Sequence, residues 1–71
     1  MKKIYVTGIA GLLGSNIARE LKDLYDVTGA DRNDVDVYGI DYDVFDLLDE
    51  TKLRESIVKH APDIIIHTVA H

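Results

Sequence analysis

The chain has no cysteine among its 71 residues. Disulfide bonds and thiolate zinc sites, the usual supports of very small secreted domains, are therefore excluded. A long apolar run is also missing, because the first hydrophobic stretch, at residues 4–8, is too short for a secretion signal or a membrane span. These absences predict a cytoplasmic protein that does not associate with membranes.

Positive charge is scarce as well. Eight Lys and Arg residues stand against 13 Asp and Glu, which gives a formal net charge of −5. Binding to nucleic acid usually needs a clustered basic face, so no nucleic-acid partner is expected. The hydrophobic fraction of 46% is that of an ordinary globular protein. A chain of this size buries only about 60% of its unfolded surface, so its stability should be marginal.

The spacing of apolar residues predicts strands alternating with helices. Residues 3–7 are a short β-rich run, and residues 8–14 place three glycines within one tight loop. A second strand is expected over residues 25–31. Between the glycine loop and the second strand we expect a helix. Its apolar face consists of Leu13, Ile17, Ala18, Leu21 and Leu24.

The second half of the chain repeats this alternation. We expect a third strand over residues 42–45, a helix capped by Asp49 and ended by Pro62, and a fourth strand over residues 64–68. The buried face predicted for this helix consists of Leu53, Ile57, Val58 and Ala61. Residues 64–66 are continuously apolar, as in a strand covered on both faces. The predicted fold class is α/β: a partial Rossmann fold whose parallel sheet has the order 3-2-1-4, with one helix on each face.

The segment 7–14, Thr-Gly-Ile-Ala-Gly-Leu-Leu-Gly, carries the main functional pattern. Its glycines let the backbone turn sharply and approach a pyrophosphate, and the start of the following helix favours negative charge. A P-loop is excluded because no Gly-Lys-Ser/Thr follows. The residues of this segment predicted to bind a dinucleotide are Gly8, Ala10, Gly11, Leu12, Leu13 and Gly14.

Asp31 ends the second predicted strand about 20 residues after the glycines, where a dinucleotide fingerprint has its acidic residue. A carboxylate there accepts hydrogen bonds from the adenosine ribose hydroxyls and favours NAD. Arg32 follows it, and a guanidinium there can stack on adenine, pair with the 2′-phosphate of NADP, or simply lie in solvent. The predicted cofactor is therefore NAD or NADP.

The pattern TGxxGxxG, together with later segments, resembles the extended short-chain dehydrogenase/reductases over nearly the whole chain. Residues 1–71 would then be the N-terminal half of a Rossmann-type NAD(P)-binding domain. The resemblance implies that Asp46, followed by Leu47, meets the adenine amino group. It also places His67, Thr68 and Val69, at the end of the fourth strand, beside the cofactor. Val69 stands where the family has Ala.

Within this family the chain is most similar to the dTDP-4-dehydrorhamnose reductase branch, followed by the sugar-nucleotide epimerases. Relatives use a Tyr-x-x-x-Lys pair in general acid catalysis, and none of the four tyrosines here has a lysine four residues later. We therefore assign no catalytic residue and expect the chain to be inactive alone. An alternative is a non-catalytic dinucleotide-binding or regulatory module, because the loop also resembles that of a methionine adenosyltransferase regulatory subunit.

No metal site is predicted. Asp34 and Asp36 begin like a calcium loop, but Tyr38 and Phe45 replace two of its oxygen ligands, which favours a solvated acidic loop. His67 and His71 are four residues apart at the end of a strand, where they would not share the face a zinc site needs.

Association with a second copy is expected from the fourth strand. That strand is apolar on both faces, and one of its edges has no predicted neighbour. Open apolar edges recruit other strands, so we predict a homo-oligomer formed through this strand.

Overall fold

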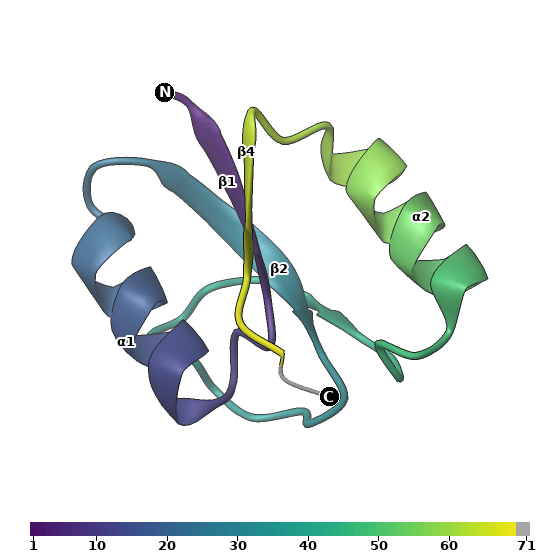
Figure 1. The fold of residues 1–71 in the computed structure, drawn as a ribbon. Helices are drawn as coiled ribbons and strands as arrows, with labels where there is room; N and C mark the ends of the chain where they lie inside the picture. Colours follow the sequence, from purple (N-terminus) through teal and green to yellow (C-terminus); the bar gives the residue numbers. More distant parts are fainter. Residues whose placement is uncertain (70–71) are drawn as a thin grey trace.

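A computed structural model describes residues 1–69 and shows a parallel sheet between two helices (Figure 1). The elements are, in order, β1 (Lys3–Thr7), α1 (Leu12–Leu21), β2 (Asp26–Asp31), β3 (Asp43–Val44), α2 (Glu50–His60) and β4 (Ile64–His67). The strands pair in parallel in the order β3-β2-β1-β4. The predicted fold class and sheet order are confirmed, although β3 is shorter than predicted and β2 begins one residue later.

β1 lies between β2 and β4, and its alternating side chains build both layers of the molecule. Ile4 and Val6 pack with Ala18 of α1 in the apolar core. Tyr5 points to the opposite face, where its hydroxyl lies 2.7 Å from Ser56 Oγ of α2. Because successive strand residues face opposite sides of a sheet, α1 and α2 cover different faces, as predicted and as Figure 1 shows.

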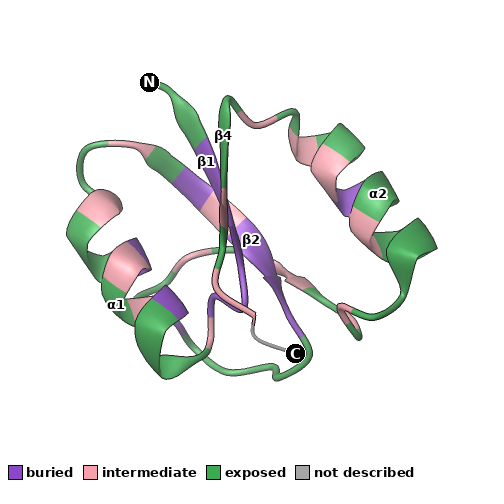
Figure 2. Cartoon of the chain, viewed as in Figure 1, coloured by how far each residue is buried: buried purple, intermediate pink, exposed green. Residues whose placement is uncertain are grey.

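The loop between β2 and β3 completes the core on the α1 side. Val37, at its centre, is buried against the same cluster as Ile4 and Val6. Tyr42 closes the loop, since its hydroxyl accepts the Val35 N–H at 2.9 Å and lies 2.7 Å from the Asn33 carbonyl oxygen. In Figure 2 the buried positions concentrate on β1 and β2, while the outer sides of both helices are exposed.

The buried face predicted for α1 is partly wrong. Leu13 is 61% exposed and Leu24 lies beyond the end of the helix, also exposed. The residues of α1 that are buried are Gly14 and Ala18. Gly14 approaches the preceding loop so closely that it must face inward, which turns the adjacent Leu13 toward solvent.

The buried face predicted for α2 is also partly wrong, because Leu53 and Ile57 are half-buried but Val58 and Ala61 are exposed. The predicted Asp49 cap is confirmed by its bond from the Lys52 N–H at 3.1 Å. Ser56 is the buried residue of this helix, whereas Val58 is 72% exposed and Ala61 is a left-handed C-cap. Hydrogen bonds explain this difference from the prediction. The Ser56 hydroxyl bonds to Tyr5 and Asp43, and these bonds orient α2 with Ser56 toward the sheet.

Asp43 is the centre of a polar network between β3 and α2. One carboxylate oxygen is 2.5 Å from Ser56 Oγ and 3.1 Å from His60 Nε2, and the other is 2.9 Å from Lys59 Nζ. Partial burial alone would raise the pKa of Asp43, but the hydrogen bonds from Ser56, Lys59 and His60 outweigh it and hold that pKa below its ordinary value. Burial raises the pKa of Tyr5, which keeps the phenol neutral.

β4 forms one edge of the described sheet. Ile64 and Ile65 are 43% and 49% exposed, so the strand is not covered on both faces as the apolar run suggested. No element of the described chain lies on its outer side. Neither helix in the described residues is long and apolar enough to cross a membrane.

We expect Asp43→Asn to lower the free energy of unfolding at pH 7 by about 1–3 kcal/mol, because it weakens charge-assisted hydrogen bonds. Folding lowers this pKa, so the stabilisation is fully present above the ordinary value of 3.8 and is lost as pH falls through the folded-state pKa. Denaturant titrations from pH 7 to pH 2.5 should therefore show the difference between parent and variant shrinking with acid.

Asp23→Asn is the matched control, because this carboxylate is 83% exposed and, within residues 1–69, forms an ion pair with Lys22 alone. It should change stability by less than about 0.5 kcal/mol at every pH. A pH-independent difference between parent and Asp43→Asn would contradict the role given to the ionised network.

Candidate nucleotide-binding site

The loop between β1 and α1 is shaped by its own backbone hydrogen bonds. Gly8 has a φ of 73°, in the left-handed region that suits glycine. Its N–H donates to the Ala30 carbonyl of β2 at 2.9 Å, and its carbonyl accepts the Gly11 N–H at 3.0 Å. The loop therefore turns back over the carboxyl ends of β1 and β2 before the helix begins.

The three glycines of this loop serve different purposes. A Cβ on Gly14 would lie 2.1 Å from the Gly8 carbonyl oxygen, so helix and loop touch only because this residue has no side chain. A Cβ on Gly8 would lie 2.6 Å from Thr68 Oγ1. A Cβ on Gly11 would meet only the Gly8 oxygen, at 3.3 Å, and otherwise faces open space. Gly11 thus leaves room for a ligand at the start of the helix.

The N-terminus of α1 is suited to an anion. Gly11 is its N-cap, and no side chain among the described residues caps it or adds an acidic group to its first turn. The first N–H groups of a helix have no intrahelical acceptor, and the helix dipole places partial positive charge there. The open space at Gly11 and these free donors fit a pyrophosphate, so the residues present are compatible with a dinucleotide.

Asp31 ends β2 directly beside the loop and is only 5% exposed. One carboxylate oxygen accepts the Ala10 N–H at 3.0 Å, and the other accepts the Asn33 N–H at 2.9 Å. A carboxylate accepts about four hydrogen bonds, so each oxygen keeps capacity for a ribose hydroxyl. The sequence placed Asp31 correctly at the strand end but gave no sign of its bond to Ala10.

A cavity of about 350 Å³ opens at this carboxyl edge of the sheet. It brings together six residues predicted from the sequence and two that sequence reasoning missed, Asn33 and Leu48. Its lining consists of Gly8, Asp31, Arg32, Asn33, Asp46, Leu47, Leu48 and Val69. Asp46 is oriented by the Leu48 N–H, which donates to it at 3.0 Å. Leu12 and Leu13 lie outside this lining, exposed at the start of α1.

The end of β4 is bonded to the end of β1. His67 Nδ1 lies 2.7 Å from Thr7 Oγ1, and Thr68 Oγ1 donates to the Thr7 carbonyl at 2.6 Å. His71, considered with His67 as a zinc pair, lies outside the described residues. Within residues 1–69 no group of three His, Asp or Glu side chains is arranged to hold a metal ion.

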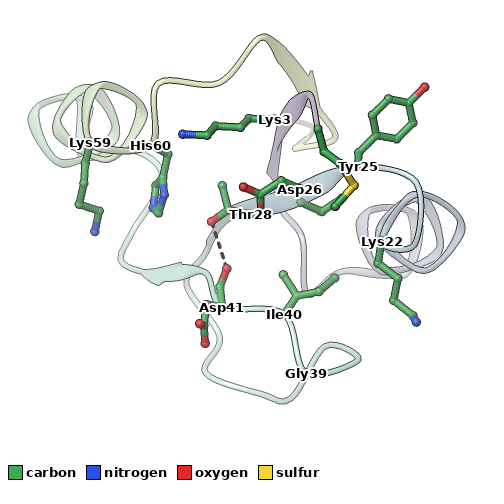
Figure 3. Close-up of a pocket in the computed structure, with 12 residues that line it drawn as sticks. Lys3, Lys22, Tyr25, Asp26, Thr28, Gly39, Ile40, Asp41, Lys59 and His60 are labelled. Atoms are coloured by element: carbon green, nitrogen blue, oxygen red, sulfur yellow. Dashed lines mark hydrogen bonds between the residues drawn. The ribbon is translucent and has the colours of Figure 1, made fainter.

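A second cavity, of about 490 Å³, lies at the opposite end of the sheet. Figure 3 shows lysine and aspartate side chains together there, including Lys3 and Asp26 at the starts of β1 and β2, and the bond from Thr28 to the Asp41 carbonyl oxygen. Ligands of open parallel sheets bind beyond the carboxyl ends of the strands. The cavity beside the glycine loop, which connects β1 to α1, is therefore the candidate site.

Comparison with known proteins agrees with this geometry. The model of the NAD dependent epimerase/dehydratase family matches residues 4–71. The chain belongs to this family. The predicted resemblance to the extended dehydrogenase/reductases is confirmed at this level, and so is the nicotinamide dinucleotide as cofactor, because the family is NAD-dependent. No curated protein gives a significant match.

Two solved structures are similar to this chain. L-threonine dehydrogenase from Clostridium difficile is 27% identical, with a TM-score of 0.85 over 100% of this chain and 24% of that one. The enzyme WbmH from Bordetella bronchiseptica, solved in complex with NAD+, is 29% identical, with a TM-score of 0.82 over 100% of this chain and 26% of that one. The chain thus spans about a quarter of the length of each protein.

The glycine geometry predicts effects of different size for two equivalent substitutions, Gly14→Ala and Gly11→Ala. Ala favours a helix over Gly by about 1 kcal/mol, yet Gly14→Ala should destabilise the chain by more than that gain, because its Cβ would overlap the Gly8 carbonyl. Gly11→Ala should change stability by about 1 kcal/mol or less, since a single neighbour at 3.3 Å has to adjust. Chemical denaturation followed by circular dichroism measures both, and equal effects would show that α1 does not depend on this close approach.

Proposed function

We propose that this chain binds the adenosine and pyrophosphate half of NAD and forms the N-terminal half of a Rossmann-type NAD(P)-binding domain. The observation that carries the proposal is the cavity at the carboxyl edge of the sheet, bordered by the Gly8 loop and by Asp31. The uncapped N-terminus of α1 supplies donors for phosphate beside it. Such an edge, at the point where the strand order reverses, is the usual ligand position in this architecture.

Each part of the site has a separate role in this proposal. The pyrophosphate lies over Gly11, with the amides of residues 12–14 directed at it. Asp31 accepts the adenosine ribose hydroxyls while its bond to the Ala10 N–H keeps the loop in place. Asp46 and Leu47 border the adenine end of the cavity. His67, Thr68 and Val69 complete the edge toward the nicotinamide half of the cofactor.

We propose NAD rather than NADP as the preferred cofactor. Asp31 is buried and its carboxylate is held by two backbone N–H groups, so it cannot swing away from a 2′-phosphate. A phosphate placed against this carboxylate would be repelled. Arg32 is the opposing influence, because it lines the same cavity and carries the charge that attracts phosphate.

The larger enzyme to which this half-domain corresponds is proposed to be a sugar-nucleotide reductase similar to dTDP-4-dehydrorhamnose reductase. A sugar-nucleotide epimerase is the second candidate, favoured by the family description. When bound, the nicotinamide would supply hydride-transfer chemistry. This chain has no Tyr-x-x-x-Lys pair to move the accompanying proton, so we propose that it is inactive alone. A purely binding or regulatory module would use the same cavity.

Weak binding of adenine nucleotides is the expected result for this chain, because only part of the full cofactor site is present. Titration of the 15N-labelled chain with NAD, NADP and ADP should shift the amides of residues 8–14 and 31–33. Gly11→Val should abolish these shifts, since its side chain fills the space left for the phosphates.

Gly39→Val is unsuitable as a control because Gly39 has a positive φ and Gly11 does not. Asn16→Val serves as the control instead. Asn16 is an exposed residue of α1 one turn beyond the loop, and its substitution should leave binding within about twofold. Binding by Gly11→Val equal to that of the parent would place the nucleotide elsewhere. NADP preference that disappears in Arg32→Ala would reverse the assignment of NAD.

We also propose that the chain self-associates through β4. The strand is an edge of the sheet, with Ile64 and Ile65 about half exposed. Ile65 pairs in register with Tyr5 and therefore lies on the α2 side, where Val58 adds further exposed apolar surface. Two copies pairing their β4 strands antiparallel around a twofold axis would satisfy the free edge and bury these side chains.

Ile65→Lys should shift the chain toward monomer in sedimentation equilibrium. The side chain is 49% exposed in the monomer, so the free energy of unfolding of the monomeric form should change little. Val44→Lys is a matched control, because Val44 is 48% exposed on the opposite edge strand, β3. A parent that remains monomeric at millimolar concentration, or equal effects of both lysines, would exclude β4 as the interface.

A further inference from the structure

The glycine loop is held from outside by a residue near the end of the described chain. We propose that Thr68 is a positioning residue, whose hydroxyl fixes the Thr7–Gly8 peptide and with it the nucleotide-binding conformation of the loop. The consequence for ligand affinity rests on the proposed function, whereas the effect on loop conformation does not.

Thr68 and Thr7 share several hydrogen bonds in a partly buried setting. Thr68 Oγ1 donates to the Thr7 carbonyl oxygen at 2.6 Å, and the Gly8 carbonyl oxygen is a more distant acceptor at 3.4 Å. The Thr68 N–H lies 3.3 Å from both the carbonyl oxygen and Oγ1 of Thr7. Thr7 is 1% exposed, so water cannot readily replace a bond lost here.

His67 completes this arrangement. Thr7 Oγ1 accepts the Thr68 N–H, which leaves its own proton for one acceptor. His67 Nδ1, at 2.7 Å, is much closer than the Ile66 carbonyl oxygen at 3.5 Å. This contact joins the side chains of Thr7 and His67 in one network around the Thr7–Gly8 peptide.

The absence of a side chain on Gly8 makes this contact possible. A Cβ there would lie 2.6 Å from Thr68 Oγ1 and 3.0 Å from Val69 Cγ2. The threonine hydroxyl therefore occupies the space that glycine leaves open. Because the bond fixes the Thr7 carbonyl, it also fixes the direction of the next residue, whose carbonyl accepts the Gly11 N–H and touches Gly14.

The loop in turn determines where the ligand donors lie. Gly11 is the N-cap of α1, so a change in the Gly8 carbonyl alters the start of the helix and the direction of its free N–H groups. Thr68 itself does not line the cavity. The place proposed for Thr68 is toward the nicotinamide half of the cofactor, which ADP lacks. Its influence on ADP binding is therefore indirect, through the peptide that it holds.

A matched set of variants separates this hydroxyl from general packing. Thr68→Val keeps the β-branched shape without the hydroxyl, and Thr68→Ser keeps the hydroxyl without the methyl group. Thr28→Val removes a comparable bond, from Thr28 Oγ1 to the Asp41 carbonyl at 3.0 Å, which lies away from the glycine loop. Two measurements apply to each: hydrogen exchange of the Gly11 amide, and the affinity for ADP from NMR titration.

In Thr68→Val we expect Gly11 exchange to accelerate and the Kd for ADP to rise, each by roughly 3- to 10-fold, the effect of one net hydrogen bond. Thr68→Ser should restore both within about twofold, and Thr28→Val should leave both unchanged. Unchanged Gly11 exchange in Thr68→Val, or failure of serine to restore it, would overturn the proposal.

Two further observations keep the outcomes distinct. If the parent does not bind ADP, the proposed function fails, while Gly11 exchange still decides the role of Thr68. If Thr68→Val does not fold, the parent itself decides: a Thr68 hydroxyl proton protected from exchange, with a nuclear Overhauser effect to Gly8, supports the proposal, and a rapidly exchanging one without that effect overturns it.

Discussion

The contact between Gly14 and the carbonyl of Gly8 determines how the first helix sits on the sheet. A single added carbon atom would stand 2.1 Å from that oxygen. Because helix and loop touch there, α1 begins at the carboxyl edge of β1 and directs its free N–H groups along that edge. The bond from the Ala10 N–H to Asp31 depends on the same constraint, since the amide reaches the carboxylate only when the loop folds back over β2.

Different interactions hold the two helices against the two faces of the sheet. On the α1 side the contacts are apolar, with Ile4, Val6 and Val37 excluded from water. On the α2 side the closest contacts are polar and converge on Ser56 and Asp43. Apolar burial tolerates small shifts of a helix, whereas hydrogen bonds of fixed direction do not. The polar face therefore sets the orientation of α2 more strictly than its hydrophobic residues would.

Sequence reasoning succeeded where one local pattern decides the outcome. The glycine spacing and the Asp49 cap follow from short-range rules, and the order of the strands follows from the fixed handedness of crossover connections. All three agree with the structure. It failed where a contact with a residue far along the chain decides which side chain is buried. Nothing near Ser56 indicates that it faces inward, because its partners, Tyr5 and Asp43, lie 51 and 13 residues away along the chain. The Thr68 bond to Thr7 was hidden for the same reason.

The pairing of β1 with β4 also has a consequence for biosynthesis. Ile4 is registered against Ile64, so β1 acquires its second neighbour 60 residues later along the chain. At about 5–20 residues per second, ribosomes take roughly 3–12 s to cover that interval. Throughout this time one edge of β1 presents free backbone N–H and carbonyl groups. The nascent chain is then at its most vulnerable to aggregation, and chaperone binding during translation would protect the same strand that later forms the centre of the sheet.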